Sequence, residues 1–403
     1  MRRLAERAPL RPSPRPGGRL LCPGCVAQRR RFAAAAPPAS GLAALPSRRL
    51  LAVTGPHAAQ FLQGIITANL HAPPDARPRS AGFYAGFLNA TGRVLYDVFV
   101  YPFRGSFGPL DKVADGGYLV EVDAAQSGNL ARHIKRYKLR ARLDVRELLP
   151  DEASVWQAWD DAAADIGLAR AELAPGARQL SCRDPRAPGL GYRVVKVDAQ
   201  PPQLPLERAA EDAYTLRRYL RGVPEGQDEI IREQALPLES NMDLMDGLDF
   251  RKGCYVGQEL TIRTRHRGVV RKRILPCIVY ESDAPAPTAL AYEPAPAPAT
   301  AADAIPGQTS IGRVGKHGRS AGKWLKGMGN IGLALCRLEA MTGALVPGQQ
   351  QQPQPPQQQG AYDAGDEFVL EWAGGQDGAE RSVKVKAFVP AWMNEPGRGE
   401  PTS

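Results

Sequence analysis

Arg251-Lys-Gly-Cys-Tyr-Val-Gly-Gln-Glu-Leu260 is the most specific string in this chain. Gly253 and Gly257 permit tight backbone geometry around the cysteine, and residues 258–266 predict a helix. Cys254 then lies just ahead of a helix N-terminus and beside two cations, a setting that favours the reactive thiolate over the thiol. The alternative is a buried cysteine that packs as a small hydrophobic residue, and local physics does not decide between the two.

The chain on either side of this string predicts two kinds of architecture. Before it, strand patterns alternate with helical patterns, with strands at 50–53, 83–88, 94–101, 118–122, 141–145 and 192–197 and helices at 57–69, 130–137 and 212–220. After residue 270 we find strand patterns with turn signals and no long helix, at 274–280, 312–314, 331–338, 368–372 and 382–389. The predicted fold class is α+β, closed by a small C-terminal β-barrel.

Length and composition exclude several other classes of protein. The chain has 403 residues, of which 43% are hydrophobic, and this size predicts two or three domains with cores of their own. No stretch approaches the ~20 apolar residues needed to span a membrane. Six cysteines are too few for a disulfide scaffold, so the composition indicates a reducing compartment.

The positive charge is concentrated at the N-terminus. Residues 1–40 hold nine arginines against one glutamate, which account for +8 of the net charge of +10 and leave +2 for the rest. An arginine-rich segment with almost no acid predicts a mitochondrial transit peptide over 1–40, and a basic disordered tail is the alternative. Cys22 and Cys25 have the spacing of a redox motif, but they lie inside this leader without a βαβ context.

Two further segments are too poor in apolar side chains to join a core. Residues 283–304 are dominated by Ala and Pro, and residues 346–362 by Gln and Pro. Both are predicted to be disordered insertions. The predicted domains are therefore the leader, a unit over 41–270 and the barrel over 271–395.

Several motifs, taken in order, resemble one known family. Lys252-Gly-Cys-Tyr-x-Gly-Gln-Glu259 resembles the signature of the YgfZ branch of the folate-binding glycine-cleavage T-protein superfamily. Leu88-Asn-x-x-Gly-Arg-Val-Leu-Tyr-Asp-Val98 resembles its hairpin, and Gly329-x-x-Gly-Leu-x-Leu-x-Arg-Leu-Glu339 its barrel strand. Further similar pieces lie at 51–69, 218–226 and 237–243. The resemblance covers residues 45–390, and the leader points to the mitochondrial iron–sulfur cluster assembly members of this branch.

The resemblance implies a fold, a function and a set of site residues. The fold would be two mixed α/β modules and a barrel around a cavity where relatives hold tetrahydrofolate. The function would be late maturation of four-iron four-sulfur proteins such as aconitase and lipoate synthase in the mitochondrial matrix, with A-type iron–sulfur scaffold proteins as partners. The functional thiol would be Cys254, within a signature of Lys252, Gly253, Tyr255, Gly257, Gln258 and Glu259. The folate cavity would be lined by Asp97, Arg193 and Arg218.

Departures from the T-protein pattern bear on enzyme activity. T-proteins carry two adjacent aspartates where this chain has Tyr96-Asp97, and a pterin-binding Glu where it has Arg193. They also have an Asp-Phe-Ile-Gly string in place of Cys-Tyr-Val-Gly. These changes point away from an enzyme, and an active folate-dependent aminomethyl or methyl transferase is retained as the alternative.

Two other kinds of partner are not expected. The basic stretch 263–273 has no interleaved aromatic residues for base stacking, so nucleic acid is not predicted. The five histidines form no Cys/His pair with zinc spacing, and the core offers no group of four thiolates, so no stably bound metal is predicted. A transient cluster shared with a partner through Cys254 is a hypothesis.

Overall fold

The structure is a computed structural model that describes residues 37–395 except for 73–76, 106, 111–115, 164–165, 169–177, 268–269, 295–299, 317, 344–361 and 374–378. The transit peptide predicted for 1–40 lies outside the described residues for all but its last four positions. The insertion predicted over 346–362 lies outside them for all but its last residue.

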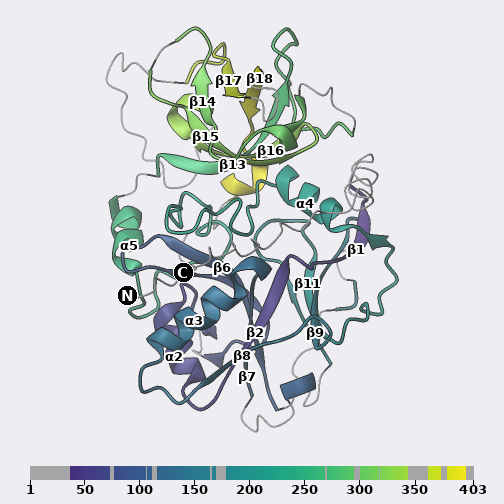
Figure 1. Ribbon diagram of the computed structural model, residues 1–403, viewed down its shortest axis with the longest axis vertical. Helices are drawn as coiled ribbons and strands as arrows, with labels where there is room; N and C mark the ends of the chain where they lie inside the picture. The colour runs from purple at the N-terminus through teal and green to yellow at the C-terminus, as the bar shows by residue number, and fades with distance from the viewer. Residues whose placement is uncertain are drawn as a thin grey trace, which may run out of the picture.

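Two five-stranded sheets fill the lower half of the molecule in Figure 1. The first has the order β5 (Phe83–Leu88), β6 (Val94–Phe103), β7 (Gly117–Asp123), β2 (Arg48–Thr54), β8 (Asp144–Glu147). The second has the order β10 (Gln179–Arg183), β11 (Tyr192–Val197), β9 (Ala153–Asp160), β1 (Ser40–Ala44), β12 (Arg208–Ala209). All neighbours pair antiparallel except β1 with β12. A separate two-stranded ribbon joins β3 (His71–Ala72) to β4 (Arg77–Pro78).

Both faces of the first sheet are covered. Val98 and Val100 of β6 share a buried cluster with residues of α2 (Ala58–Ile65) and α3 (Ser127–Tyr137), the helices on the outer face. Phe99 and Tyr101, on the other face of β6, share a cluster with residues of the second sheet. Burial on both faces explains why β6 is an almost unbroken apolar run. Its exception is Asp97, which is fully buried.

The helix predicted over 57–69 is shorter in the structure and ends at Ile65. Ile66 is extended and forms a β-bridge with Phe87, and the Thr67 hydroxyl accepts a hydrogen bond from the Gly86 amide at 2.7 Å. If the helix continued past Ile65, Ile66 would lose its β-bridge to Phe87. Pairing with β5 therefore ends the helix.

The C-terminal part is a closed six-stranded barrel, at the top of Figure 1. Its strands run in the order β13 (Lys272–Tyr280), β16 (Ile331–Arg337), β15 (Gly322–Met328), β14 (Ser310–Arg313), β17 (Phe368–Ala373), β18 (Glu380–Ala387). The short helix α6 (Leu338–Met341) follows β16. Cys277 and Cys336 are fully buried here, as the strand patterns predict, with their sulfurs 4.0 Å apart. Strand β15 has no counterpart among the predicted strands.

The described part of 283–304 does not behave as its composition predicts. Leu290 and Tyr292 pack against a buried cluster of barrel residues, and Ala302 in a short 3-10 turn is fully buried. A few apolar side chains are enough to fix this segment, because the barrel supplies the apolar surface on which they pack.

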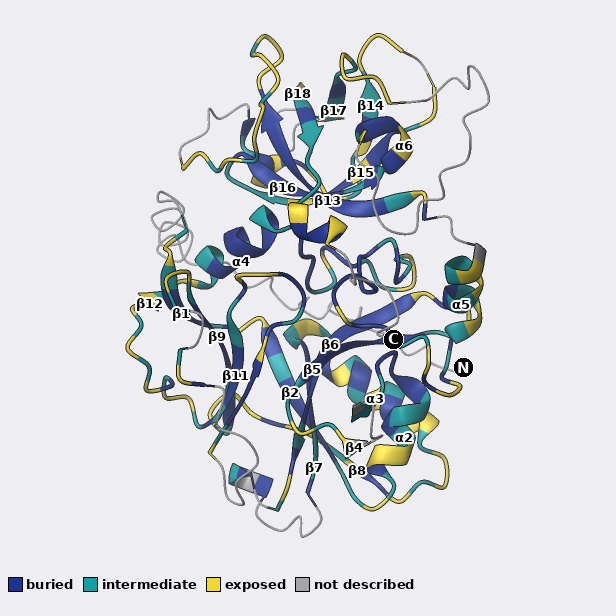
Figure 2. Ribbon diagram, turned by 180° about the vertical axis from the view of Figure 1, so that it is seen from behind, coloured by how far each residue is buried: buried dark blue, intermediate teal, exposed yellow. Residues whose placement is uncertain are grey.

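Two helices lie between the barrel and the sheets (Figures 1 and 2). α4 (Glu211–Leu220) contacts both β1 and β16, and α5 (Gln258–Arg267) follows the cysteine string. None of the helices in the described residues is long and apolar enough to cross a membrane.

Candidate functional site

The loop that carries Cys254 is fastened to the first sheet by Lys252. The Lys252 ammonium donates to the Ile66 carbonyl at 2.7 Å and to the Ala68 carbonyl at 2.8 Å, and it lies 5.1 Å from the centre of the Tyr255 ring. Lys252 and Tyr255 are 8% and 6% exposed, so both are anchored in the interior. The lysine that the signature places beside the cysteine is thus a structural clamp.

The backbone on the other side of the cysteine packs against the hairpin turn after β5. The Val256 amide donates to the Gly64 carbonyl at 3.1 Å. Gly257 has φ +81°, and a Cβ there would lie 2.3 Å from the Asn89 carbonyl oxygen, so this position admits only glycine. Gln258 accepts a hydrogen bond from the Tyr255 amide at 3.3 Å, which closes the turn into α5.

Between these anchors, the loop presents Gly253 and Cys254 to solvent. Both are exposed, as is Glu259 in the first turn of α5, and nothing lies within 4 Å of a Cβ built on Gly253. Because α5 begins at Gln258, the cysteine lies a full turn before the helix and gains little from its terminal field. Cys254 is the one exposed cysteine among the residues that the structure describes, since the other three are buried.

Replacing Lys252 with methionine should remove a pH dependence of stability. Burial lowers the pKa of Lys252 from 10.5 to about 7, so between these values the folded chain binds fewer protons than the unfolded chain. The free energy of unfolding of the wild-type chain therefore rises across this range, by up to about 1.4 kcal/mol per pH unit.

Urea unfolding at a series of pH values measures this difference. The exposed Lys135 supplies a control, because Lys135→Met leaves the buried ammonium in place and should keep the wild-type slope. Equal slopes for Lys252→Met and the wild-type chain would contradict the prediction.

The three residues expected to contact folate are buried in an ion network instead. Asp97 accepts hydrogen bonds from the Arg48 guanidinium and the Gly226 amide, each at 3.2 Å. Arg193 donates to Glu225, and Arg218 donates to Glu229 at 2.7 Å. The full network joins β2, β6, β7, β11 and α4 through Arg48, Asp97, Glu121, Asp184, Arg186, Arg193, Arg218, Glu225 and Glu229.

Among these three side chains, no acceptor is free for a pterin. A pterin needs a free acceptor for its N–H groups, but the only carboxylate of the three belongs to Asp97, which Arg48 already binds. Burial raises the pKa of Asp97 although Arg48 opposes this, which is the response of a carboxyl group enclosed by protein. The Nε and Nη1 atoms of Arg193 have no hydrogen-bond partner, although Nε lies 3.5 Å from a Glu121 carboxylate oxygen, and an arginine offers a pterin only donors. Each of Asp97, Arg193 and Arg218 is paired with a neighbour of opposite charge, and their part in a folate site stays a prediction.

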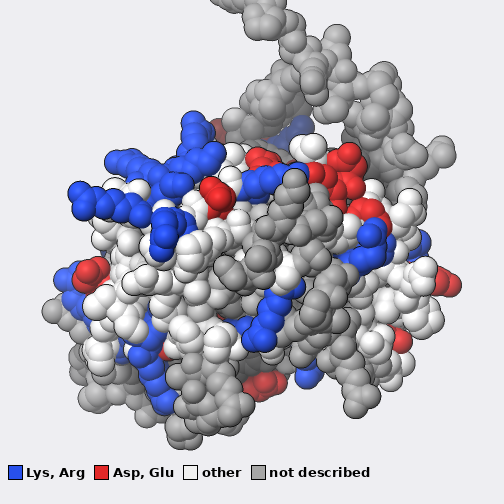
Figure 3. Space-filling model, turned by 90° about the horizontal axis from the view of Figure 1, so that it is seen from below, with Lys and Arg blue, Asp and Glu red and all other residues white. Residues whose placement is uncertain are grey.

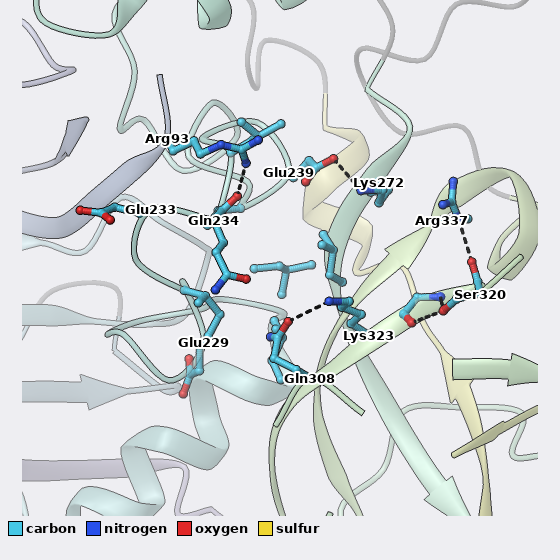
Figure 4. Close-up of a pocket in the computed structure, with 18 residues that line it drawn as sticks. Arg93, Glu229, Glu233, Gln234, Glu239, Lys272, Gln308, Ser320, Lys323 and Arg337 are labelled. Atoms are coloured by element: carbon cyan, nitrogen blue, oxygen red, sulfur yellow. Dashed lines mark hydrogen bonds and ion pairs between the residues drawn. The ribbon is translucent and has the colours of Figure 1, made fainter. Parts of the chain in front are cut away.

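A cavity of about 520 Å³ separates the segment 229–240 from the barrel. It is lined by none of the signature residues and by no cysteine or histidine. Figure 4 shows its polar groups engaged with one another, in pairs formed by Arg93 with Gln234, Glu239 with Lys272, Gln308 with Lys323 and Ser320 with Arg337. Of the carboxylates that line the cavity, Glu239 is paired with Lys272 and Glu229 with Arg218.

Comparison with known proteins agrees with this arrangement. Residues 271–395 match the family described as "CAF17, C-terminal beta-barrel domain". A protein of Pyricularia oryzae named "iron-sulfur cluster assembly factor IBA57 homolog, mitochondrial" is 51% identical over 406 residues, which cover 98% of this chain and 97% of the relative. The protein of the same name from Chaetomium globosum is 46% identical and covers 93% and 90%. The chain belongs to this family of mitochondrial iron–sulfur cluster assembly factors.

The fold of this assembly-factor chain also has a solved counterpart. The crystal structure of the glycine cleavage system aminomethyltransferase T from Bartonella henselae superposes with a TM-score of 0.56 at 13% identity, covering 91% of this chain and 89% of the other. The predicted T-protein-like fold with a C-terminal barrel is confirmed, and so are the predicted family and mitochondrial location.

Most of the ion network in this family member leaves no signal in the sequence. Glu225 lies inside the segment 218–226, which resembles the family, yet nothing in that segment marks it as the partner of two arginines. Arg48, Glu121 and Arg186 had no signal, because a single charged residue in a strand or loop reads as solvent-facing.

Proposed function

We propose that this protein holds an iron–sulfur cluster jointly with an A-type scaffold protein, in the step that matures four-iron four-sulfur proteins in the mitochondrial matrix. The observation that carries the proposal is the exposed Cys254 thiol on a loop whose neighbours Lys252 and Tyr255 are locked in place. The names of the relatives, which describe cluster assembly in mitochondria, support the same role.

The cluster is cargo, and this chain supplies one of its ligands. Iron–sulfur clusters are held by about four thiolates or equivalent ligands. Within the described residues there is no group of three Cys, His, Asp or Glu side chains that could hold a metal ion. A cluster on Cys254 therefore needs its remaining ligands from the partner. As the Cys254 sulfur bonds to iron, its proton passes to solvent.

A fixed loop suits such an exchange. The thiolate must reach a cluster that already sits on another protein, so freedom of the loop would cost entropy each time the two proteins met. The Lys252 clamp and the Gly257 contact with the hairpin turn hold the loop before the partner arrives. The scheme does not use Asp97, Arg193 or Arg218, which bind Arg48, Glu225 and Glu229 within the fold.

Enzyme activities in mitochondria test the proposal. In cells whose only copy is Cys254→Ser, we expect aconitase activity to fall at least about tenfold. The activity of a two-iron ferredoxin should stay normal. Gly253→Ala is the matched control, because its Cβ meets nothing within 4 Å and the thiol remains.

Two outcomes would overturn it. Normal aconitase in the Cys254→Ser cells would show that the thiol is not needed for four-iron clusters. A fall in glycine-cleavage flux with normal aconitase would replace cluster assembly with the alternative, a folate-dependent aminomethyl or methyl transferase.

A further inference from the structure

The outer face of α3 and the loop after it form a strongly basic surface. Residues 127–143 contain no acidic residue, and their cations are Arg132, Lys135, Arg136, Lys138, Arg140 and Arg142. All except the half-buried Lys138 are exposed. Figure 3 shows a dense group of Lys and Arg side chains on the underside of the molecule, toward the side where α3 lies in Figure 1. We call Arg132, Lys135, Arg136, Leu139, Arg140 and Arg142 the α3 basic surface.

Leu139 lies between Arg136 and Arg140 in the sequence of this surface. Its side chain is 86% exposed, the highest value among the exposed large hydrophobic residues, and its backbone has φ +42°. Left-handed backbone is unfavourable for a leucine, and glycine or asparagine fits it better. Because Leu139 is 86% exposed, packing within the fold does not offset this unfavourable backbone conformation. A residue whose backbone conformation is unfavourable and whose side chain does not stabilise the fold indicates a role in binding another molecule.

Ordinary helix energetics explains only part of the charge. Lys135 and Arg136 lie in the last turn of α3, where cations complement the helix C-terminus, and Lys138 donates to the Leu143 carbonyl at 2.9 Å. Arg140 and Arg142 lie beyond the helix and gain nothing from it.

The surrounding acidic groups do not neutralise this surface. Acidic residues follow this surface in the chain. Glu147 accepts a hydrogen bond from the Ser127 hydroxyl at 2.6 Å, and Glu152 pairs with Arg146. Asp144 is exposed. Among the described residues, no cation of the α3 basic surface forms an ion pair with a carboxylate. The surface therefore keeps its positive charge, and it matches a partner with closely spaced negative charges.

We propose that the α3 basic surface binds the anionic lipid headgroups of a membrane, with the Leu139 side chain inserted among the acyl chains. The cations supply attraction to the headgroups, and the exposed leucine among them in the sequence supplies the apolar anchor that electrostatics alone lacks. Nucleic acid is the less suitable partner, since the most exposed apolar side chain, Leu139, is aliphatic, and the one exposed aromatic ring of α3, that of Tyr137, already lies 4.6 Å from the His133 ring. The protein would thus attach reversibly to a membrane surface without spanning it, and this does not depend on what Cys254 does.

Vesicle flotation tests the proposal. The processed chain, recovered from mitochondria so that the arginine-rich leader is absent, is mixed with vesicles of phosphatidylcholine alone or with phosphatidylglycerol added. We expect binding to the anionic vesicles only, weakened as salt is raised above about 0.15 M.

Variants separate the two contributions. Leu139→Asn suits the left-handed backbone but removes the apolar anchor, so it should fold normally and bind at least about tenfold more weakly. Lys135→Gln with Arg136→Gln should weaken binding by about fivefold for each charge. The matched controls lie on the barrel, where Val314→Asn replaces a 42% exposed apolar side chain and Arg319→Gln an exposed cation, and both should bind like the wild-type chain.

The proposal is overturned by any of three results. These are equal binding to neutral and anionic vesicles, wild-type binding by Leu139→Asn, and losses in the barrel controls as large as those on the α3 basic surface. A duplex oligonucleotide serves as the competing probe at the same salt. If it binds more tightly than the vesicles and loses binding in Lys135→Gln/Arg136→Gln, the surface is a nucleic-acid site instead.

Discussion

Replacing Glu225 with glutamine should lower the free energy of unfolding by about 3–5 kcal/mol, the cost of breaking a buried ion pair from one side. Glu225 accepts hydrogen bonds from Arg186 at 2.7 Å, from Arg193 and from the Tyr214 hydroxyl at 2.8 Å. Glutamine has nearly the same shape but no charge, so two fully buried guanidinium groups would lose a shared counter-ion.

The pH dependence of stability should change in the same variant. Burial opposes ionisation of Glu225, but Arg193, Arg186 and Arg48 together hold its pKa well below the usual range. A depressed carboxyl pKa stabilises the fold at neutral pH, and this contribution is lost as the pH falls toward the pKa of the folded state. The variant lacks the contribution, so its stability should fall less on acidification.

Urea unfolding of the two chains, at neutral and at acid pH, measures both effects. Glu371→Gln is the matched control, because Glu371 is an exposed glutamate in β17 and its loss should change stability by no more than about 0.5 kcal/mol. If Glu225→Gln is no more destabilising than Glu371→Gln, the network does not hold the two sheets and α4 together as described.

Replacing Cys254 with serine should abolish the cluster that we propose this protein shares with an A-type scaffold. A serine hydroxyl is a poor iron ligand, and no other cysteine among the described residues is exposed to take its place. Visible circular dichroism of the cluster-loaded scaffold should change on addition of the wild-type chain and should not change with Cys254→Ser. Size-exclusion chromatography should show a cluster-dependent complex for the wild-type chain alone.

Gly253→Ala again provides the control, because it alters the same loop and leaves the sulfur. Thermal unfolding should be the same for all three chains, since Cys254 makes no buried contact. A wild-type spectrum and complex from Cys254→Ser would remove this thiol from cluster binding and leave the loop without an assigned chemistry.

Much of the fold follows from local patterns, and its departures have physical causes. The alternation over 94–101 places Val94 with Tyr96, yet Val94 belongs to the cluster on the opposite face. The ladder pairs Leu88 with Val94 and Phe87 with Tyr96, so β6 holds one extra residue at this β-bulge. Periodicity cannot register a bulge, because the extra residue is apolar like its neighbours.

The candidate site also has one part that the sequence predicts and one part that it does not. The cysteine loop could be located from its glycines and its string, because close backbone approaches demand glycine at particular positions. The buried network could not, since Arg193 pairs with Glu225 and Arg48 with Asp97 across distances in sequence that no local pattern reports. For the same reason, the arginines expected to meet folate turned out to meet glutamates.

The clamp on the cysteine loop also has a consequence for when the thiol is presented. Lys252 reaches carbonyl groups 186 and 184 residues earlier in the chain, so the loop closes only after this long-range pairing has formed. In an unfolded chain, Cys182, Cys277 and Cys336 are as accessible as Cys254, whereas folding encloses those three. Among the described residues, the unfolded chain therefore has four accessible thiols, and the completed fold leaves only that of Cys254 accessible to the partner.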